Sequence, residues 1–439
     1  MMAGETFRGG VEPGHFKYTT EDAVEKMAAP SKVYIPMEQH IGAPCEPVVS
    51  KGDKVKLGQK IGGSDSFVSA PIHSSVSGEV VDITEYNHPI GKKAKTIVIE
   101  SDGQDEADYS GGYDSLDELS SDDIKKIVKE AGIVGMGGAT FPTHVKLSPP
   151  EDKPIDTVII NGAECEPYLT SDHRMMLEQG EEIVFGLKSI MKAVNCDKGV
   201  IGIEDNKKDA IENMKELVKD ENNIEVMVFE TKYPQGAEKQ LITVATGREV
   251  PSGGLPMDVG CVVNNVGTAI AISEAIRYNK PSYERVVTVT GPGVNEAGNF
   301  KIRVGTLASE VIENCAGMSQ NTRKIVMGGP MMGLSQPSPE FPVIKGTSGL
   351  LLLTENEVQF FEEKPCISCG RCIDSCPVSL LPNMIAHFTE NERLEQAEEY
   401  NALDCIECGC CTYICPTKRP LVQYIRMAKG EIMAKRRKN

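Results

Sequence analysis

At 439 residues, with 14 cysteines, no tryptophan and a formal net charge of −18 at pH 7, the chain is long enough for about two to four domains with their own cores. The acidic balance excludes nucleic acid as the main partner, because neutralising phosphates requires a basic surface. No apolar run approaches the ~18 residues of a membrane-spanning helix, and Met1–Gly10 lacks the apolar stretch of a signal peptide. We therefore expect a cytosolic protein whose cysteines bind metal instead of forming disulfides.

In the N-terminal region, short runs separated by Gly, Asp and Ser predict β-strands. These runs are Val33–Ile35, Pro47–Val49, Lys54–Leu57, Phe67–Ala70, Glu79–Ile83 and Thr96–Glu100. The stretches Gly52–Ile61 and Val76–Val80 resemble the two halves of a biotinyl/lipoyl-type barrel, in which carriers present a modified lysine on the hairpin between them. Here Gly62–Ser69 contains no lysine. We expect a structural barrel with its linker over residues 1–115.

A regular alternation of strands and helices follows. Ile124, Ile127, Val128 and Ala131 have helical spacing and predict a first helix from Ser121. Further strands are expected at Thr157–Ile160, Val200–Ile203 and Ile224–Phe229, and helices at Met175–Val194, Lys207–Lys219, Ala237–Ala245 and Asn264–Tyr278. Because this alternation is typical of βαβ crossovers, residues 116–283 are predicted to form a domain with a parallel sheet.

The last two units differ in composition from this domain. Residues 284–355 predict a small mixed α+β domain with strands Val286–Thr290, Phe300–Val304, Lys324–Met327 and Gly349–Thr354 and a helix near Leu307–Ala316. The acidic spacer Glu355–Glu363 then leads into a cysteine-rich domain, residues 356–439.

Eight of the C-terminal cysteines form a repeated motif. Cys366-x-x-Cys369-x-x-Cys372-x-x-x-Cys376-Pro377 recurs as Cys405-x-x-Cys408-x-x-Cys411-x-x-x-Cys415-Pro416. Bacterial two-cluster ferredoxins use this run to bind [4Fe–4S] clusters, with the fourth cysteine of each motif bound to the other cluster. The predicted ligand sets are Cys366, Cys369, Cys372 and Cys415 for one cluster, and Cys376, Cys405, Cys408 and Cys411 for the other. Zinc ribbons, the main alternative, use paired Cys-x-x-Cys hairpins. Cys410 falls outside the pattern and is interpreted as a bystander.

A glycine-rich segment, Gly132–Thr143, is the second outstanding feature. It lacks the third glycine of the dinucleotide fingerprint and follows a helix instead of a strand, and the chain has no P-loop motif. Its backbone N–H groups can close around a phosphate or a flat ring, but a flexible domain connection is an equal alternative.

Polar residues follow the first strand of the predicted parallel sheet. Asn161, Glu164 and Glu166 lie where ligands bind in open α/β sheets, although the two carboxylates alone are equally compatible with solvated loop charges. Asn264 or Asn265 is most simply a helix N-cap, with a ligand contact as the alternative.

These segments together resemble a known family. Gly135-x-Gly137-Gly138-Ala139-x-Phe141-Pro142-Thr143, Asn161-x-x-Glu164-x-Glu166-Pro167, Gly236-x-Glu238 and Asn264-Asn265 resemble, in this order, the flavin- and NADH-binding subunit of respiratory complex I. With the N-terminal barrel, the double cysteine motif and Phe7–Gly10, the whole chain resembles the RnfC family, whose members are subunits of the Rnf electron-transport complex.

The resemblance implies a multidomain α/β fold. Its parts are an N-terminal β barrel-sandwich hybrid, a Rossmann-like parallel α/β flavin domain, a β-grasp module called SLBB, and a C-terminal α-helical two-cluster ferredoxin domain. The positions that match FMN contacts are Gly135, Gly137, Lys146, Asn161, Glu164, Tyr233, Gly236, Glu238, Asn264 and Asn265. Those that match NADH contacts are Gly138, Phe141, Glu166 and Glu238. Two positions depart from complex I, since Ala163 replaces an acidic flavin contact and an aromatic adenine contact is replaced near Pro149.

The resemblance also implies the function. The chain is expected to be the NADH-reacting, redox-active subunit of a membrane ferredoxin:NAD oxidoreductase that translocates ions. Hydride would be exchanged with non-covalent FMN, and single electrons would pass through two [4Fe–4S] clusters, with no catalytic acid, base or nucleophile. The expected location is peripheral, on the cytoplasmic face of the membrane, beside the other Rnf subunits. The basic stretch Lys418–Asn439 fits docking to anionic headgroups or an acidic partner, or is a solvated charge run. The alternatives are a soluble flavin iron–sulfur reductase, such as a microcompartment cobalamin reductase, and a non-enzymatic iron–sulfur adaptor.

Overall fold

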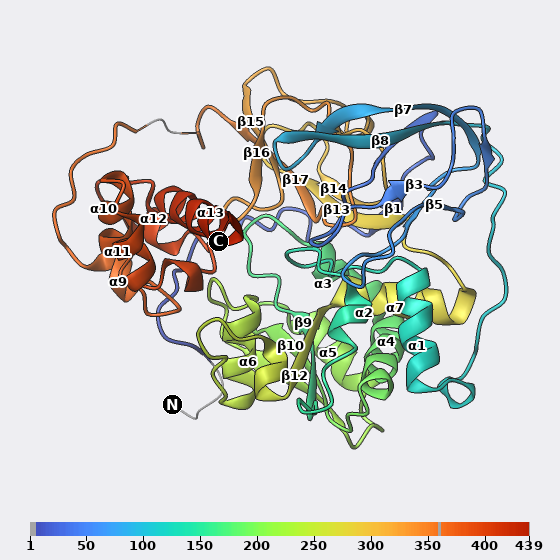
Figure 1. The fold of residues 1–439 in the computed structure, drawn as a ribbon, viewed down its shortest axis with the longest axis horizontal. Coiled ribbons are helices and arrows are strands. Elements are labelled where there is room, and N and C mark those ends of the chain that lie inside the picture. Colours follow the sequence, from blue (N-terminus) through green and yellow to red (C-terminus); the bar gives the residue numbers. More distant parts are fainter. Residues whose placement is uncertain (1–5, 359–360, 439) are drawn as a thin grey trace.

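The computed structural model describes residues 6–358 and 361–438. Residues 1–5, 359–360 and 439 lie outside the description, including two residues of the predicted acidic spacer. Three units with β-sheets form the main body, and a helical C-terminal unit lies beside them (Figure 1). This agrees with the predicted multidomain α/β architecture.

The N-terminal unit is a barrel-like sandwich of two sheets. Its strands are β2 (Lys32–Pro36), β3 (Glu46–Pro47), β4 (Lys54–Val55), β5 (Lys60–Gly63), β6 (Ile72–His73), β7 (Gly78–His88) and β8 (Lys92–Ser101). The sheets have the orders β2-β8-β7-β4 and β3-β5-β6, and Val33, Ile61 and Ile97 are buried between them.

One strand prediction in this unit is wrong. Phe67–Ala70 is a loop, because its backbone bonds to other loops instead of to a neighbouring strand. The Ala43 N–H donates to the Val68 carbonyl at 2.9 Å, and Ala70 N–H donates to the His40 ring at 3.1 Å.

The second unit has a four-stranded parallel sheet of order β11-β10-β9-β12, as the alternation predicts. The strands are β9 (Thr157–Gly162), β10 (Gly199–Glu204), β11 (Ile224–Phe229) and β12 (Cys261–Asn265). The helices are α1 (Ser121–Glu130), α2 (Thr143–Lys146), α3 (Ser171–Glu178), α4 (Gly180–Ala193), α5 (Lys208–Leu217), α6 (Glu238–Thr246) and α7 (Val266–Tyr278), with short 3₁₀ turns at Leu116–Glu118 and Pro256–Val259.

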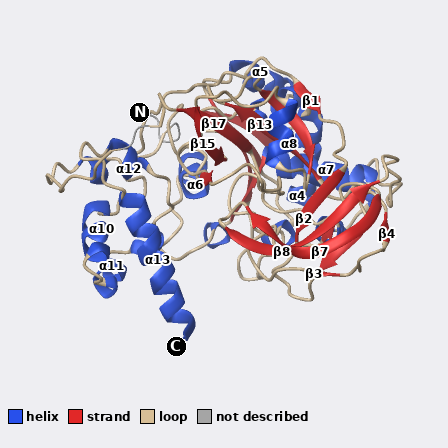
Figure 2. Cartoon of the chain, turned by 90° about the horizontal axis from the view of Figure 1, so that it is seen from above, coloured by secondary structure: helices blue, strands red, loops and turns tan. Residues whose placement is uncertain are grey.

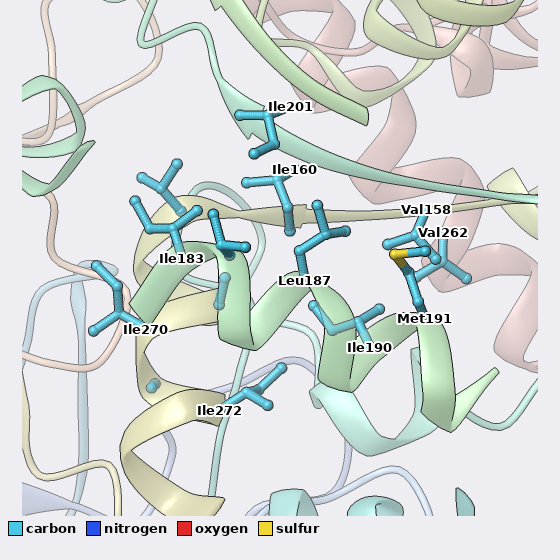
Figure 3. Packing of buried hydrophobic residues seen from close by; sticks show 14 of the residues in the cluster. Val158, Ile160, Ile183, Leu187, Ile190, Met191, Ile201, Val262, Ile270 and Ile272 are labelled. Carbon is cyan, nitrogen blue, oxygen red and sulfur yellow. The ribbon is translucent and has the colours of Figure 1, made fainter. Parts of the chain in front are cut away.

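The core of this unit lies between the sheet and helices α4 and α7. Ile183, Leu187, Ile190 and Met191 form one face of α4 and point toward β9 and β12 (Figure 3). Helix α7 packs so closely on α4 that a Cβ on Gly186 would lie 2.1 Å from the Ala269 carbonyl oxygen. The glycine is therefore required for the two helices to approach.

Two predictions in this unit need correction. The single helix predicted over Met175–Val194 is two helices, which meet at Gln179, where ψ is +35°. The helix predicted from Asn264 begins only at Val266, because Asn264 and Asn265 end the unpredicted strand β12. The N-cap prediction is right for Asn265, whose side chain accepts a hydrogen bond from Gly267 N–H.

The third unit contains β13 (Glu284–Thr290), β14 (Gly298–Arg303), α8 (Ala308–Asn314), β15 (Thr322–Met327), β16 (Leu334–Gln336) and β17 (Gly349–Thr354). Its sheet has the order β1-β14-β13-β17-β15-β16. The edge strand β1 (Val24–Lys26) comes from the N-terminal segment and pairs in parallel with β14. The N-terminal segment thus pairs with this sheet before the chain enters the barrel.

The C-terminal unit is α-helical, as predicted. Its helices are α9 (Arg371–Asp374), α10 (Pro382–Glu390), α11 (Leu394–Glu399), α12 (Cys410–Ile414) and α13 (Leu421–Lys438), with a 3₁₀ turn at Ala402–Asp404. Ile385 and Phe388 of α10 and Ile425 of α13 share its core, and α13 extends away from the body (Figure 2). Among the described residues, no helix combines the length and apolar character needed to cross a membrane.

One buried lysine joins three of these units. The Lys345 ammonium, from the loop between β16 and β17, donates to the carbonyls of Pro71 in the barrel (3.0 Å) and Gly132 in the glycine-rich segment (2.6 Å). Burial lowers its pKa to about 8. Burying the positive charge of Lys345 at this junction therefore costs free energy of folding, because the ammonium loses its water shell.

This junction predicts a pH dependence of stability. Between pH 8 and 10.5 the unfolded chain binds more protons at Lys345 than the folded chain, so the free energy of unfolding rises with pH. From pH 7 to 9.5, wild type should gain about 2 kcal/mol relative to Lys345→Met, measured by chemical denaturation. Exposed Lys93→Met is the control. A pH-independent difference between Lys345→Met and wild type would contradict this assignment.

Candidate functional site

The carboxyl ends of β9 and β12 form the topological switch point of the parallel sheet. From β9 the chain proceeds to β10 and β11 on one side and then returns to place β12 on the other. Ligands of open α/β sheets bind in the crevice at such a point. Asn161 is the last residue of β9 that pairs with β12, and Asn264 and Asn265 end β12, so three of the predicted site residues lie at this crevice.

The glycine-rich segment is a hairpin whose tip reaches the same place. Its base is closed by the Gly135 N–H, which donates to the Phe141 carbonyl at 2.9 Å. Its tip, Gly137–Ala139, is exposed, and a Cβ on Gly137 would lie 2.9 Å from the Asn265 side chain. The absence of a side chain at Gly137 therefore lets the tip lie against the end of β12.

Side chains of the third unit and of helix α7 hold this hairpin in place. The buried Arg285 guanidinium donates to the Met136 carbonyl at 2.7 Å, and the Thr268 hydroxyl accepts from Met136 N–H at 3.0 Å. Lys345 fixes the start of the segment at Gly132. These bonds favour a shaped binding loop over a flexible domain connection.

Other predicted residues meet around the crevice. The Asn161 amide donates to the Gly236 carbonyl at 2.8 Å, so the loop before α6 lies beside the end of β9. Lys146 donates to the Glu238 carboxylate at 2.8 Å and to the Val263 carbonyl at 3.0 Å. The Lys146–Glu238 pair, on α2 and at the start of α6, is partly exposed at the edge of the site.

Two buried amides have no hydrogen-bond partner among the described residues. Both side-chain polar atoms of Asn264 are unsatisfied although the residue is only 4% exposed, and the same holds for the fully buried Gln235. An unsatisfied buried amide is costly, so such groups indicate a missing partner. The sequence prediction included Asn264 but not Gln235, which lies between two predicted residues, Tyr233 and Gly236.

The two predicted carboxylates after β9 are engaged by the protein's own backbone. Glu164 accepts from Asp172 N–H (2.6 Å) and His173 N–H (3.3 Å) at the start of α3. Glu166 accepts from Met331 N–H (3.0 Å) and Met332 N–H (2.7 Å) in the third unit. Burial raises the pKa of Glu166 to about 7 despite these bonds.

A second buried acid lies below the crevice. Burial, with a smaller contribution from the Glu164 charge, raises the pKa of Asp172 to about 7. Its carboxylate accepts from the Asn265 amide at 2.6 Å, which orients Asn265 beneath the tip of the glycine hairpin.

Tyr233 connects this site to the C-terminal unit. Its ring is 2% exposed, and its hydroxyl donates to the Cys408 carbonyl at 2.8 Å. Val11 pairs with Tyr233 on its other side, and Gly10 N–H donates to the Ser375 carbonyl at 2.9 Å. The N-terminal segment thus joins the predicted flavin domain to the first cysteine motif, and Tyr233 joins this domain to the second.

The predicted cysteine sets are brought together across the two motifs. Cys366, Cys369, Cys372 and Cys415 line one cavity. In the other set, burial raises the pKa of the Cys411 thiol, with contributions from the nearby Cys405, Cys408 and Cys376. Among the described residues, no three Cys, His, Asp or Glu side chains converge on one metal ion. A cubane is wider than a single ion and keeps its ligands farther apart.

The two cysteine loops have matching backbones. Ser368 N–H donates to the Cys366 sulfur at 3.4 Å, and Glu407 N–H donates to the Cys405 sulfur at 3.3 Å. Gly370 and Gly409 then adopt left-handed conformations, with φ of 76° and 81°, before α9 and α12. Such bonds prepare each loop for thiolate ligands.

Comparison with known families covers most of the chain. Residues 5–104 match the RnfC barrel sandwich hybrid domain, and residues 128–274 match the Nuo51 FMN-binding domain. Residues 286–335 match the SLBB domain, and residues 359–416 match a 4Fe-4S dicluster domain. The predicted succession of four units is therefore confirmed.

Curated relatives extend over nearly the full length. A component of the proton-translocating ferredoxin:NAD(+) oxidoreductase complex of Clostridium ljungdahlii is 52% identical, over 97% of this chain and 94% of the relative. The chain belongs to the RnfC family. The corresponding component of the Na(+)-translocating ferredoxin:NAD(+) oxidoreductase complex of Acetobacterium woodii is 50% identical, over 99% of this chain and 98% of the relative.

A solved structure supports the fold. A chain of an NAD+-reducing [NiFe]-hydrogenase in the air-oxidized state has a TM-score of 0.51 and 18% identity, covering 71% of this chain and 63% of that chain. At this identity the similarity extends to the fold alone.

The residues present fit the cofactors of the matched domains, FMN and two [4Fe–4S] clusters. The unsatisfied amides of Asn264 and Gln235 offer donors and acceptors at the crevice, and a Cβ on Gly138 at the hairpin tip would meet no atom within 4 Å. The cross-motif cysteine sets offer four thiols to each cluster. We propose that the other predicted contact residues complete the FMN and NADH site.

This site predicts opposite effects for two asparagines. Asn264→Leu removes an unsatisfied amide, so the flavin-free chain should keep or gain thermal stability while FMN affinity falls at least about tenfold. Asn299→Leu is the matched contrast, because Asn299 bonds to Thr170, Thr288 and the Thr19 carbonyl and its loss should lower stability. Flavin fluorescence quenching and thermal unfolding measure both effects. Unchanged FMN affinity in Asn264→Leu would contradict the assignment.

Proposed function

We propose that the chain is the NADH/NAD-reacting electron-transfer subunit of a membrane ferredoxin:NAD oxidoreductase that translocates ions. The near-full-length relatives with 52% and 50% identity carry this activity in their names. The observation that carries the proposal most directly is the hydrogen bond between Tyr233 of the flavin domain and Cys408 of the second cysteine motif. It supports the proposal because it joins the flavin domain to the second cysteine motif within one polypeptide.

The chemistry requires three kinds of centre. NADH donates a hydride, which carries two electrons, whereas each cluster accepts one electron at a time. FMN, when bound, supplies the exchange between two-electron and one-electron transfer. The chain's own residues would bind and orient these groups. The glycine hairpin and Asn264 would hold the flavin, and Phe141 and Glu238, both partly exposed, would contact the nicotinamide nucleotide.

The two cysteine sets have distinct places in the electron path. We call Cys376, Cys405, Cys408 and Cys411 the proximal set, because Cys408 bonds to Tyr233. We call Cys366, Cys369, Cys372 and Cys415 the distal set. Cys366 and Cys369 are exposed, whereas every cysteine of the proximal set is buried or half-buried. The distal cluster is thus the one placed to exchange electrons with partner subunits.

Domain order and length argue against the alternatives. The barrel precedes the flavin domain, and the Rnf relatives match nearly end to end, which favours the Rnf subunit over a cobalamin reductase. The unsatisfied Asn264 and Gln235 favour a working nucleotide site over a decayed one.

Attachment to the membrane complex is proposed to run through other Rnf subunits on the cytoplasmic face. Several basic side chains of α13 pair within the C-terminal unit: Lys429 with Glu407 (2.7 Å), Lys435 with Glu395 (3.1 Å) and Arg436 with Glu398. These pairs reduce the free positive charge for lipid headgroups, which favours protein partners as the docking surface.

The nucleotide assignment predicts a selective effect of Glu238→Gln. The change removes the negative charge that pairs with Lys146, so kcat/KM for NADH should fall about tenfold. The amount of FMN bound per chain should stay constant. Anaerobic stopped-flow bleaching of the flavin measures the rate. Glu212→Gln on the exposed face of α5 is the control, and unchanged NADH kinetics in Glu238→Gln would argue against the assignment.

The proposed order of clusters predicts asymmetric results for two ligand variants. In Cys405→Ala, NADH should no longer reduce the distal cluster, although dithionite still does. In Cys369→Ala, NADH should still reduce the proximal cluster. EPR spectra of samples frozen after anaerobic mixing distinguish the two, and the reverse pattern would overturn the order.

A further inference from the structure

Two lysines from separate segments bind the carbonyls of the loop that follows β9, residues 163–169. Lys207, directly before α5, donates to the Ala163 carbonyl at 2.6 Å, and its side chain is 3% exposed. Lys17, in the N-terminal segment, has a side chain that is 17% exposed. Its ammonium donates to three further carbonyls of the loop, those of Glu164 (2.9 Å), Glu166 (2.9 Å) and Leu169 (2.5 Å).

Both lysines lie on the same side of this loop. In the parallel sheet β9 has β10 on one side and β12 on the other, and Lys207 follows β10 after a short turn. Lys17 lines a cavity together with Glu204 at the end of β10 and Thr231 just after β11. The two ammonium groups therefore approach the loop from the β10 side, away from the crevice between β9 and β12.

These bonds fix the direction of two successive peptide groups. The carbonyls of Ala163 and Glu164 point toward the lysines, and both peptides are trans. Because the N–H of a trans peptide points opposite to its carbonyl, the N–H groups of Glu164 and Cys165 point toward β12 and the crevice. Neither N–H has an acceptor within residues 6–358 and 361–438. Glu164 also has a left-handed backbone, with φ of 47°, which such a loop keeps only when its surroundings hold it.

The lysines also offset negative charge beneath the crevice. The Glu164 carboxylate lies 3.9 Å from the Lys17 ammonium, and the Glu204 carboxylate lies 3.3 Å from that of Lys207. Both acid side chains are almost fully buried, with 4% and 1% exposed. An unpaired buried carboxylate would oppose any further negative charge nearby, so each lysine makes the crevice more favourable for an anionic group.

We propose that Lys17 and Lys207 direct the N–H groups of Glu164 and Cys165 at the flavin ring and thereby favour its reduced form. A hydride carries two electrons and one proton, so its transfer from NADH leaves NAD+ and adds one negative charge to the flavin. Fixed N–H donors that point at developing negative charge stabilise it without reorganisation. Both lysines are positioning residues that act through the loop, and the inference rests on the proposed flavin site and its reaction with NADH.

The test compares the affinities of the full, cluster-loaded chain for oxidised FMN and for dithionite-reduced FMN, with free flavin measured after anaerobic ultrafiltration. In Lys17→Met the dissociation constant of reduced FMN should rise about tenfold more than that of oxidised FMN. This corresponds to a two-electron midpoint potential about 30 mV more negative. Lys207→Met should shift the ratio in the same direction. Because Lys207 belongs to a different segment, its variant tests the inference even if Lys17→Met fails to fold.

The matched control is Lys192→Met. Lys192 is half-buried and donates to the Leu116 carbonyl at 2.5 Å, outside the crevice, so its loss should change neither dissociation constant. Equal loss of affinity for both oxidation states in the variants of Lys17 and Lys207 would overturn the inference, because it would indicate a purely structural role. Unchanged affinities would overturn it as well. A wild-type chain that binds FMN in neither oxidation state would overturn the proposed function itself.

Discussion

The contact between Tyr233 and Cys408 joins the domain that matches an FMN-binding domain to the domain that matches a 4Fe-4S dicluster domain. Electron transfer between a flavin and an iron–sulfur cluster depends on a fixed, short separation, and a cluster domain on a free tether would not maintain one. Here the Tyr233 hydroxyl bonds to the cysteine loop, and the N-terminal segment adds bonds from Val11 and Gly10 on either side. A Cβ on Gly9 would lie 2.8 Å from the Cys376 carbonyl oxygen, so this segment lies directly on the end of the first cysteine motif.

The third unit has an equally direct effect on the proposed nucleotide site. Arg285 and Lys345 hold the glycine hairpin from outside the flavin domain, and the N–H groups of Met331 and Met332 hold Glu166. The hairpin contains too few side chains to define its own shape, because glycines allow many backbone conformations. Contacts from the neighbouring domains therefore fix the shape of the glycine hairpin, which its own sequence does not fix.

Much of the architecture was predictable from local patterns. Strand β11 matches its predicted range, Ile224–Phe229, because apolar residues and turn signals coincide there. The gathering of Cys366, Cys369, Cys372 and Cys415 around one cavity was predictable from the spacing of the repeated motif. Asn265 caps α7, as the residue type suggests.

The remainder depends on long-range contacts. Strand β12 was missed because it runs into α7 without a turn, so Asn264 and Asn265 resembled a helix start. The pairing of β1 with β14 joins segments that are distant in sequence and carries no local signal. The same is true of Lys345, whose carbonyl partners come from two other domains, and of Gln235, whose unsatisfied amide is visible only once its surroundings are placed.

Hydride entry and one-electron exit are proposed to occur in this single polypeptide. The most direct test is an anaerobic NADH titration of the flavin- and cluster-loaded chain, followed by visible absorbance and EPR. Flavin bleaching and reduced-cluster signals should develop together. Reducible clusters without any flavin bleaching by NADH would contradict this proposal and leave the chain as an iron–sulfur relay.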